Sequence, residues 1–243
     1  SAADVAARAS TLFLCLPGRA QLRTLSEGEL LRAARPGLTV VDLGTSGVGL
    51  TRELAKRFDE RGADYADAPI ARTRAAAESA TLSITVGASP EVFARIEPLL
   101  RCMASDVTHC GPPGAGQAVK LLNNMVLSIT VMALAEALAV AKASGAVDPK
   151  LLFETLMKGS ADSFALRNHG MKALLPETHP EKAFPVTYMM KDVGYALELA
   201  RSAGLRLPGG ETIFELLKET SELGLGEAYH TAIIESIRKR RAP

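Results

Sequence analysis

The sequence predicts an α/β domain with a largely parallel sheet, followed by an all-helical domain. Up to about residue 115, short apolar segments of strand length alternate with amphipathic segments of helix length, as in strand–helix–strand units. Beyond that point every segment favours helix, and none is convincing as a strand. A chain of 243 residues is long enough for two ordinary domains. We therefore expect the α/β domain over residues 1–115 and the helical domain over residues 116–243.

Five segments of the first half are predicted strands. Residues 11–16 and 38–43 are apolar runs typical of buried parallel strands. The second run is followed by Gly44-Thr45-Ser46-Gly47, and small polar residues at the carboxyl end of a parallel strand lie where ligands bind in open sheets. The remaining predicted strands are 65–69, the alternating and half-exposed 81–86, and 106–109. The helices predicted between them are 20–34, 52–61 and 90–103.

Glycine and proline divide the second half into predicted helices. These cover residues 117–144, 149–158, 161–175, 188–203, 211–222 and 228–240. The first of them, roughly 27 residues long, would span about 40 Å. A helix of that length can connect two domains or form an interface between subunits.

A single lysine begins the longest uncharged stretch of the chain. No residue between Lys120 and Glu136 is charged, and a helix that is apolar nearly all round is normally buried. A buried lysine is costly unless it is paired or its charge is used. Asn124 lies one helical turn after Lys120, with Asn123 close by, so an ammonium and a carboxamide could hold and protonate a substrate oxygen. The alternative is a lysine that extends to the surface beside two helix-weakening asparagines.

The composition argues against several functional classes. With 47% hydrophobic and 23% charged residues the chain is globular, and a net charge of +1 gives no reason to expect nucleic-acid or membrane binding. The uncharged run 121–135 is shorter than the roughly 20 residues that span a bilayer, so we expect a core helix. Three cysteines and scattered histidines have no metal-ligand or disulfide spacing, so no metal site is expected. No signal peptide is visible, and we expect a cytoplasmic protein.

Five short motifs occur in order along the chain. They are Cys15-Leu-Pro17, Asp42-Leu-Gly-Thr45, Asp67-Ala-Pro69, Gly114-Ala-Gly116 with Lys120 and Asn123-Asn124, and Lys191-Asp192. Each is modest alone, but in this order and at this spacing they resemble the motifs of the β-hydroxyacid dehydrogenases, the family of 3-hydroxyisobutyrate dehydrogenase, tartronate semialdehyde reductase and sulfolactaldehyde reductase. The resemblance covers nearly the whole chain, and it implies a Rossmann-type domain followed by an all-α domain.

The resemblance also implies an activity and a set of site residues. The activity would be NAD- or NADP-dependent hydride transfer between a small 3-hydroxy acid, or hydroxysulfonate, and its semialdehyde. Lys120 would be the general acid and base, and Asn124 would hold the substrate oxygen or orient Lys120. The other implied contacts are Leu16, Pro17 and Thr45 with the cofactor, Asn123 with the substrate, and Lys191 with both. An imine reductase is a less favoured reading, because those related enzymes usually lack lysine at the position of Lys120.

The predicted substrate loop departs from the family pattern. Many members read Asp-Ala-Pro-Val-Ser-Gly-Gly, whereas Arg72 and Thr73 replace the two glycines here. Arginine can make a bidentate, charge-assisted contact to an anion, and a Gly-Arg-Thr loop resembles that of sulfolactaldehyde reductases, where the arginine meets a sulfonate. We therefore expect Arg72 and Thr73 to bind a carboxylate or sulfonate. The equally open alternative is that Arg72 and Arg74 are solvated loop charges.

The family's first element is not visible in this sequence. Members begin with a strand, a Gly-x-Gly-x-x-Gly turn and a helix, so the chain is expected to start about one and a half βαβ units late, with an incomplete Rossmann-type domain. The choice between NAD and NADP stays open. A second hypothesis is a truncated, inactive homologue that serves as a helical oligomerisation module. From the resemblance and the long apolar helix we expect a homodimer or homotetramer.

Overall fold

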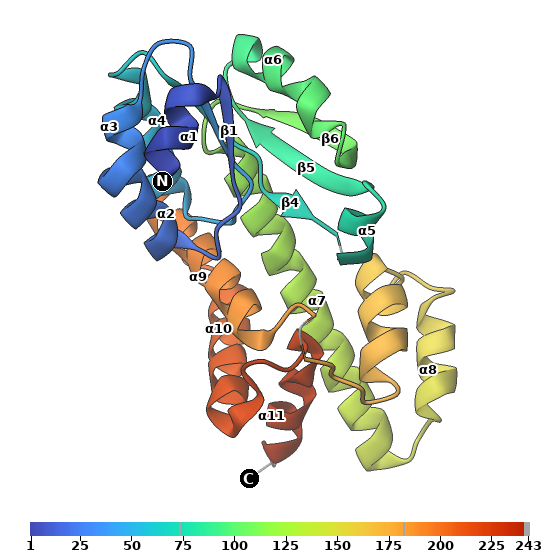
Figure 1. Cartoon of the computed structure of the whole chain (residues 1–243). Helices are drawn as coiled ribbons and strands as arrows, with labels where there is room; N and C mark the ends of the chain where they lie inside the picture. The colour runs from blue at the N-terminus through green and yellow to red at the C-terminus, as the bar shows by residue number, and fades with distance from the viewer. Residues whose placement is uncertain (73, 182, 241–243) are drawn as a thin grey trace. The chain divides into compact units, whose positions relative to one another are not determined.

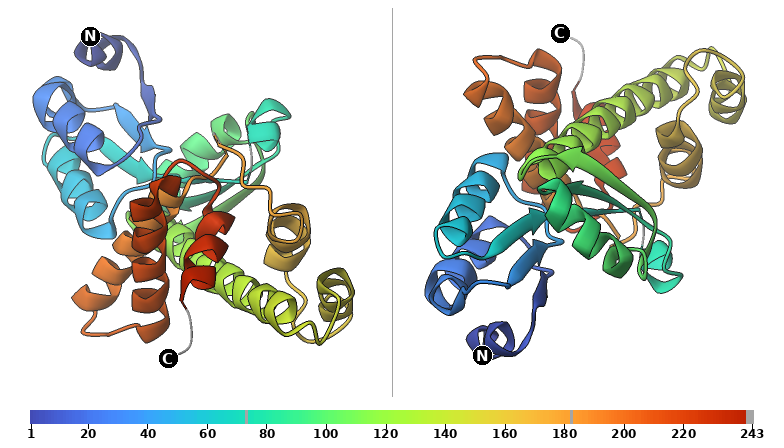
Figure 2. Two further views of the ribbon diagram at one scale, coloured as in Figure 1. Left: turned by 90° about the horizontal axis from the view of Figure 1, so that it is seen from below. Right: turned by 90° about the horizontal axis from the view of Figure 1, so that it is seen from above.

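A computed structural model describes residues 1–72, 74–181 and 183–240 (Figure 1). The chain divides into two compact units, Ser1–Leu122 and Asn123–Pro243, here called unit 1 and unit 2. The division falls inside the long helix α7 (Ala115–Ser144), whereas the sequence places the boundary at residues 115/116, where this helix begins. Figures 1 and 2 show α7 as one unbroken helix, so residues of both units follow a single helical register.

Unit 1 contains a mixed β-sheet. In the part of the chain that the structure describes, the strand order is β1-β2-β3-β5-β4, with β6 also paired to β5. The strands are β1 (Thr11–Leu14), β2 (Thr39–Asp42), β3 (Asp64–Asp67), β4 (Ile70–Ala71), β5 (Leu82–Gly87) and β6 (Ala104–Gly111). β1, β2 and β3 are parallel as expected, but β5 runs antiparallel to β3 and to β4. The predicted α/β class is therefore confirmed, with a sheet that is mixed.

Helices cover both faces of this sheet (Figure 2). Successive strand residues point to opposite faces, so Val40 packs with one group of helices and Val41 with another. The first face carries α1 (Ala2–Arg8), α2 (Arg19–Leu25), the π-helical turn η1 (Ser26–Leu30), α3 (Leu31–Ala33) and α4 (Val48–Asp59). The second face carries α6 (Pro90–Leu100), and the short helix α5 (Arg74–Glu78) precedes β5. Unit 1 thus has three layers, the arrangement expected of a Rossmann-type domain.

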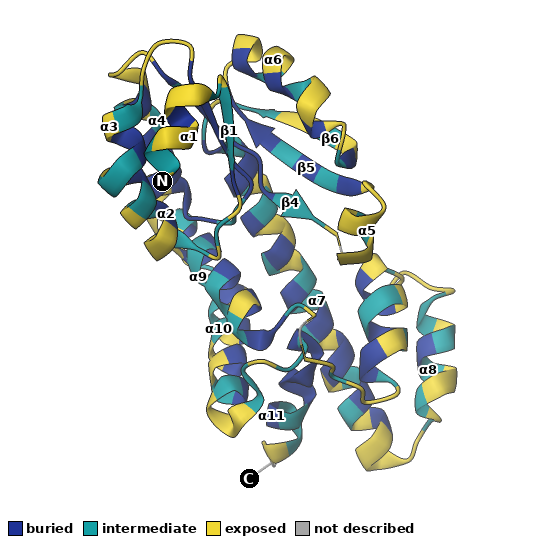
Figure 3. Cartoon of the chain, in the orientation of Figure 1, coloured by how far each residue is buried: buried dark blue, intermediate teal, exposed yellow. Residues whose placement is uncertain are grey.

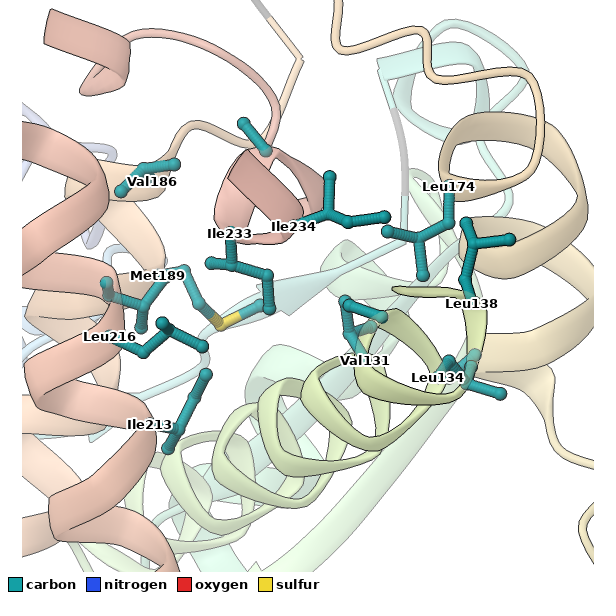
Figure 4. Close-up of a cluster of buried hydrophobic side chains, with 14 of the residues drawn as sticks. Val131, Leu134, Leu138, Leu174, Val186, Met189, Ile213, Leu216, Ile233 and Ile234 are labelled. Carbon is teal, nitrogen blue, oxygen red and sulfur yellow. The ribbon is translucent and has the colours of Figure 1, made fainter. Parts of the chain in front are cut away.

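Among its described residues, unit 2 has only helices as regular elements, as predicted, beside one isolated β-bridge between Pro185 and Tyr229. Besides its part of α7 it contains α8 (Pro149–Leu156), η2 (Leu166–Leu174), α9 (Val186–Ser202), α10 (Pro208–Thr220), η3 (Ser221–Leu225), η4 (His230–Ala232) and α11 (Ile233–Lys239). Its core gathers buried side chains from α7, α9, α10 and α11 (Figure 4). On α7 these are Val131, Leu134 and Leu138, at the 3–4 spacing of one helix face. Burying each such side chain contributes about 1.5–3 kcal/mol.

Helix α7 is buried on one side only. Exposed and buried stretches alternate along α7 (Figure 3). Val119, Leu122, Val126 and Val140 are between 42% and 66% exposed, in contrast to the full burial that its apolar composition predicts. α7 is long and apolar enough to cross a membrane, but the central helix of a globular unit can have the same length and composition. The buried row that includes Val131 accounts for part of the apolar composition.

Glycine at position 116 lets α7 begin directly against β5. A Cβ on Gly116 would lie 2.4 Å from the carbonyl oxygen of Thr85 and 2.8 Å from the amide nitrogen of Gly87. The Thr85 hydroxyl donates a hydrogen bond to the Gly116 carbonyl oxygen at 3.1 Å. No side chain fits between the helix and the strand, so the glycine of this motif serves close backbone packing.

Candidate functional site

Three parallel strands of unit 1 end at the same edge of the sheet. Leu14, Asp42 and Asp67 are register partners and the last residues of β1, β2 and β3. Ligands of open α/β sheets bind outside this edge. The loops after β1 and β2 approach each other there, because a Cβ on Gly44 would lie 2.9 Å from the carbonyl oxygen of Leu16.

The predicted cofactor contacts of unit 1 lie in these two loops. Leu16 and Pro17 follow β1, and Thr45 follows β2. A hollow of about 550 Å³ adjoins Leu16, within the usual size range of small-molecule sites. Its other lining residues are Ala20, Gln21, Thr24, Leu25, Gly28 and Glu29. Apart from Leu16, the lining of this hollow belongs to α2 and η1. At the strand ends themselves, the close approach of the two loops at Gly44 fits a ligand site.

The carboxylate of Asp67 holds the first turn of α7. Its Oδ1 accepts a hydrogen bond from the Gly114 amide at 2.6 Å, and its Oδ2 accepts one from the Gln117 amide at 2.7 Å. Both donors belong to the beginning of a helix, where backbone N–H groups lack intrahelical partners and negative charge is favoured. Asp67 is fully buried. Through these two hydrogen bonds it joins the end of β3 to the beginning of α7.

Gln117 connects α7 to the loop after β2. Its Nε2 donates to the Gly44 carbonyl oxygen at 2.7 Å, and its Oε1 accepts from the Ser46 amide at 3.2 Å. The side chain is fully buried, so both ends of its amide are used inside the protein. The backbone on either side of Thr45 is thereby fixed to the same helix turn that Asp67 holds.

Two buried carboxyl groups lie side by side at this edge, and each has a raised pKa. Burial raises the pKa of Asp42 to about 7, even though Asp42 accepts hydrogen bonds from the Gly44 amide and the Tyr65 hydroxyl. Burial likewise raises the pKa of Asp67 to about 6, against the lowering effect of its backbone donors. The negative charge of Asp67 adds to the rise at Asp42. Deprotonation of this pair is therefore costly near neutral pH.

Lys120 lies on α7 in unit 1 and is half-buried. It follows Gln117 by three residues and precedes Asn124 by four, so its position along the helix is set by the turn that Asp67 and Gln117 anchor. Half-burial places it between the two readings of the sequence, a fully buried ammonium and a fully solvated one.

In unit 2 the predicted residues Asn124 and Lys191 both lie against the carboxylate of Asp192, and Asn123 contacts Asn124. Asn124 donates from Nδ2 to Asp192 Oδ2 at 2.7 Å, and Asn123 donates from Nδ2 to Asn124 Oδ1 at 3.2 Å. Lys191 Nζ lies 3.5 Å from Asp192 Oδ1 and 5.1 Å from the centre of the Tyr188 ring. Asp192 itself is 2% exposed.

Arg72 is engaged within unit 1. Its guanidinium pairs with Asp106 at 2.5 Å and donates to the Ser105 hydroxyl at 2.8 Å and to the Thr81 carbonyl oxygen at 2.7 Å. Its backbone has φ = 83°, in the left-handed region that favours glycine, which is the residue that Arg72 replaces. These contacts favour the reading of Arg72 as a loop charge paired at the surface. Thr73, its predicted companion, lies outside the described residues.

Three residues emerge from the structure without a predicted role in the site. Asp67, Gln117 and Asp192 are buried polar side chains whose partners come from distant parts of the chain. Asp67 and Asp192 belong to recognised motifs. The feature that could have pointed to a role for them is a negative charge in apolar surroundings. Nothing in the sequence near Gln117 points to the loop after β2.

Comparison with known proteins agrees with this geometry. Residues 1–111 match the model described as the NAD binding domain of 6-phosphogluconate dehydrogenase. Residues 114–237 match that described as the NAD-binding of NADP-dependent 3-hydroxyisobutyrate dehydrogenase. Together the two models span both units.

Individual relatives lead to the same group. The chain is 33% identical over 233 residues to 2-(hydroxymethyl)glutarate dehydrogenase of Eubacterium barkeri, covering 95% of this chain and 77% of that protein. It is 30% identical over 239 residues to 2-hydroxy-3-oxopropionate reductase of Escherichia coli K12, covering 98% and 81%. A solved structure of Mycobacterium tuberculosis 3-hydroxyisobutyrate dehydrogenase with L-serine aligns with a TM-score of 0.89 at 28% identity, covering 98% of this chain and 82% of that one.

Replacing Asp42 by asparagine should change how stability depends on pH. Because the folded-state pKa of Asp42 is raised to about 7 from an ordinary value of 3.8, the folded state holds this proton more tightly than the unfolded state. Its contribution to the free energy of unfolding therefore falls as pH rises from about 4 to 7. Asparagine cannot ionise, so Asp42→Asn should gain stability relative to the parent over that range, by an amount of the order of 3 kcal/mol. Urea unfolding between pH 4 and pH 8 measures the difference.

Buried histidine acts in the opposite direction and cancels in this comparison. Burial lowers the pKa of His230 in unit 2 to about 3, so its contribution is complete above pH 6.5 and is lost as pH falls. Because His230 is present in both proteins, the difference between their curves isolates Asp42. Asp59 is exposed, so Asp59→Asn is the matched control, and its curve of unfolding free energy against pH should run parallel to that of the parent. If the curve of unfolding free energy against pH for Asp42→Asn also runs parallel to the parent curve, the raised pKa of Asp42 is contradicted.

Proposed function

The chain belongs to the β-hydroxyacid dehydrogenase family, and on this premise we propose that Lys120 is the general acid and base of its reaction. Membership makes the protein an NAD- or NADP-dependent oxidoreductase that acts on 3-hydroxy acids. The candidate products are the semialdehydes of small 3-hydroxy acids or of a hydroxysulfonate. The single observation that carries the assignment is the half-buried Lys120 on a helix turn anchored by Asp67 and followed by Asn124.

The cofactor would be held at the carboxyl edge of the unit 1 sheet. Leu16, Pro17 and Thr45 would hold it there, in loops kept close by Gly44 and Gln117. A bound nicotinamide accepts or supplies the hydride. The task of these protein groups is to hold it in position and to exclude water.

Proton transfer would take place at Lys120 Nζ. In the oxidation direction the amine takes the proton of the substrate hydroxyl, and in the reduction direction the ammonium returns a proton to the carbonyl oxygen. Asn124, one helical turn on, would hold the reacting oxygen or orient the Lys120 amine. Asn123 and Lys191 would contact the substrate, with Lys191 also near the cofactor. Lys191 lies beside Asp192, and Asn123 donates a hydrogen bond to Asn124.

Removing the Lys120 amine should greatly lower the rate of the chemical step. We expect Lys120→Ala to lower kcat by about 10²–10⁴-fold, the usual contribution of a positioned acid–base group, with cofactor affinity unchanged. Lys142→Ala, near the end of the same helix, is the matched control and should keep its turnover. Steady-state kinetics with 3-hydroxyisobutyrate and tartronate semialdehyde, together with titration of NADH and NADPH, measure both quantities.

The outcomes separate the competing functions. Near-normal turnover of Lys120→Ala would refute the acid–base role. A folded parent protein that binds neither NADH nor NADPH would instead support the inactive oligomerisation module. Micromolar binding of either nucleotide would support a complete cofactor site.

Arg72 and Thr73 are proposed contacts for the anionic end of the substrate. The Arg72 side chain is 42% exposed, so an anion can approach it, although the anion would have to compete with Asp106. We expect Arg72→Gly to raise KM for sulfolactaldehyde about tenfold or more while the backbone keeps its left-handed conformation. Arg74→Ala, which removes a neighbouring exposed charge, is the control. An unchanged KM in Arg72→Gly would leave Arg72 as a surface ion pair only.

The exposed apolar face of α7 supports a homo-oligomer, either a dimer or a tetramer. Val119, Leu122 and Val126 lie at i, i+3 and i+7 on this face, which is the spacing of a helix–helix seam. The three free cysteines and the bacterial relatives support a cytoplasmic location, which we also propose.

A charge in this face should dissociate the subunits. Val126 is 61% exposed in the single chain, so Val126→Glu should leave the fold intact and place an unpaired carboxylate in the seam. Sedimentation analysis should then show a smaller species than the parent. Val5→Glu, at an exposed apolar position on α1, is the control. An assembly that survives Val126→Glu must use another surface.

A further inference from the structure

Asp192 is a buried charge that reaches across to another helix of unit 2. It belongs to α9 and is 2% exposed, and its Oδ2 accepts a hydrogen bond from Nδ2 of Asn124 on α7 at 2.7 Å. A buried carboxylate is costly unless it is paired and hydrogen-bonded. The Asn124 amide and the Lys191 ammonium, 3.5 Å from Oδ1, meet that requirement. This buried contact joins residues 68 positions apart in the sequence.

The contact decides which way the Asn124 carboxamide points. A carboxylate only accepts hydrogen bonds, so the NH₂ group of Asn124 has to face Asp192. The amide oxygen is then turned away, where it accepts a hydrogen bond from Asn123 Nδ2 at 3.2 Å. A carboxamide that faced a neutral amide or water could adopt either orientation, because its two ends have nearly the same shape.

We propose that Asp192 is a positioning residue that holds the Asn124 amide in one orientation for catalysis. The proposal rests on the proposed function, in which Asn124 lies beside the reacting oxygen and one helical turn from Lys120. One N–H and one oxygen lone pair of Asn124 remain for these partners, and Asp192 fixes where each of them lies. The same carboxylate holds the Lys191 ammonium, so two proposed substrate-contacting residues share one anchor.

Asp192→Asn removes the charge but keeps the size and a possible hydrogen bond. The new amide can present either its oxygen or its nitrogen, so Asn124 is no longer confined to one orientation. We expect kcat to fall about 10- to 100-fold, the cost of misplacing a catalytic contact, while KM for the cofactor stays within about twofold. The exposed Glu198→Gln on the same helix is the matched control and should match the parent.

A spectroscopic measurement tests the orientation without relying on activity. In ¹⁵N-labelled protein the Asn124 side-chain amide, identified by its absence in Asn124→Asp, should show one proton shifted downfield by the charge-assisted bond. This signature should be lost in Asp192→Asn and kept in Glu198→Gln. If the parent protein shows the signature but has no turnover, the proposed function fails. If Asp192→Asn keeps both the signature and the parent kcat, the positioning role of Asp192 is overturned.

An exchange of the two side chains covers the case in which Asp192→Asn does not fold. The double variant Asn124→Asp, Asp192→Asn rebuilds a carboxylate–amide bond between the same helices with the partners reversed. A positioning role predicts that the double variant folds with restored thermal stability but keeps less than about a hundredth of the parent kcat. Recovery of turnover together with stability would show that the pair serves only the fold and would overturn the proposal.

Discussion

The carboxylate of Asp67 at the beginning of α7 is the interaction on which the geometry of unit 1 depends. It receives the Gly114 and Gln117 amides at 2.6 and 2.7 Å, in the place where a helix has unpaired donors and a positive dipole end. Gly116 lets the helix approach β5 closely, and Gln117 extends the same anchor to the loop after β2. The loop of Thr45 and the helix of Lys120 are thus held by two buried polar side chains, Gln117 and Asp67.

Polar groups buried at such an anchor have an electrostatic cost. Asp42 and Asp67 lie at neighbouring strand ends with raised pKa values, and each uses its oxygens on backbone or hydroxyl donors. Hydrophobic packing of comparable volume would be cheaper, but it lacks the directional hydrogen bonds that hold this helix and this loop in one orientation. Buried carboxyl groups with raised pKa values, concentrated at one sheet edge, are consistent with a site for chemistry.

Unit 2 uses the same principle at a different place. Most of its core is an interlocked apolar cluster that determines which helices pack together. Within it, the Asp192–Asn124 contact specifies the orientation of a single amide. Apolar side chains of similar volume can often replace one another, whereas a buried carboxylate accepts only a donor at the right position. Fold and function are therefore specified by different interactions in the same helices.

The sequence by itself determined most strands and helices of the first half, the helical second half and the Lys120–Asn124 spacing, because these are local patterns of burial and helical period. The family motifs were found by resemblance, and the short helices α1 and α5 were not predicted. The sequence did not determine the two-residue strand β4, the reversal at β5, or the ion pair of Arg72 with Asp106. Nor did it determine which partners Asp67 and Asp192 find, 47 and 68 residues away. Periodicity reports whether a side chain is buried, whereas the identity of its partner depends on how distant elements pack, which only the tertiary structure decides.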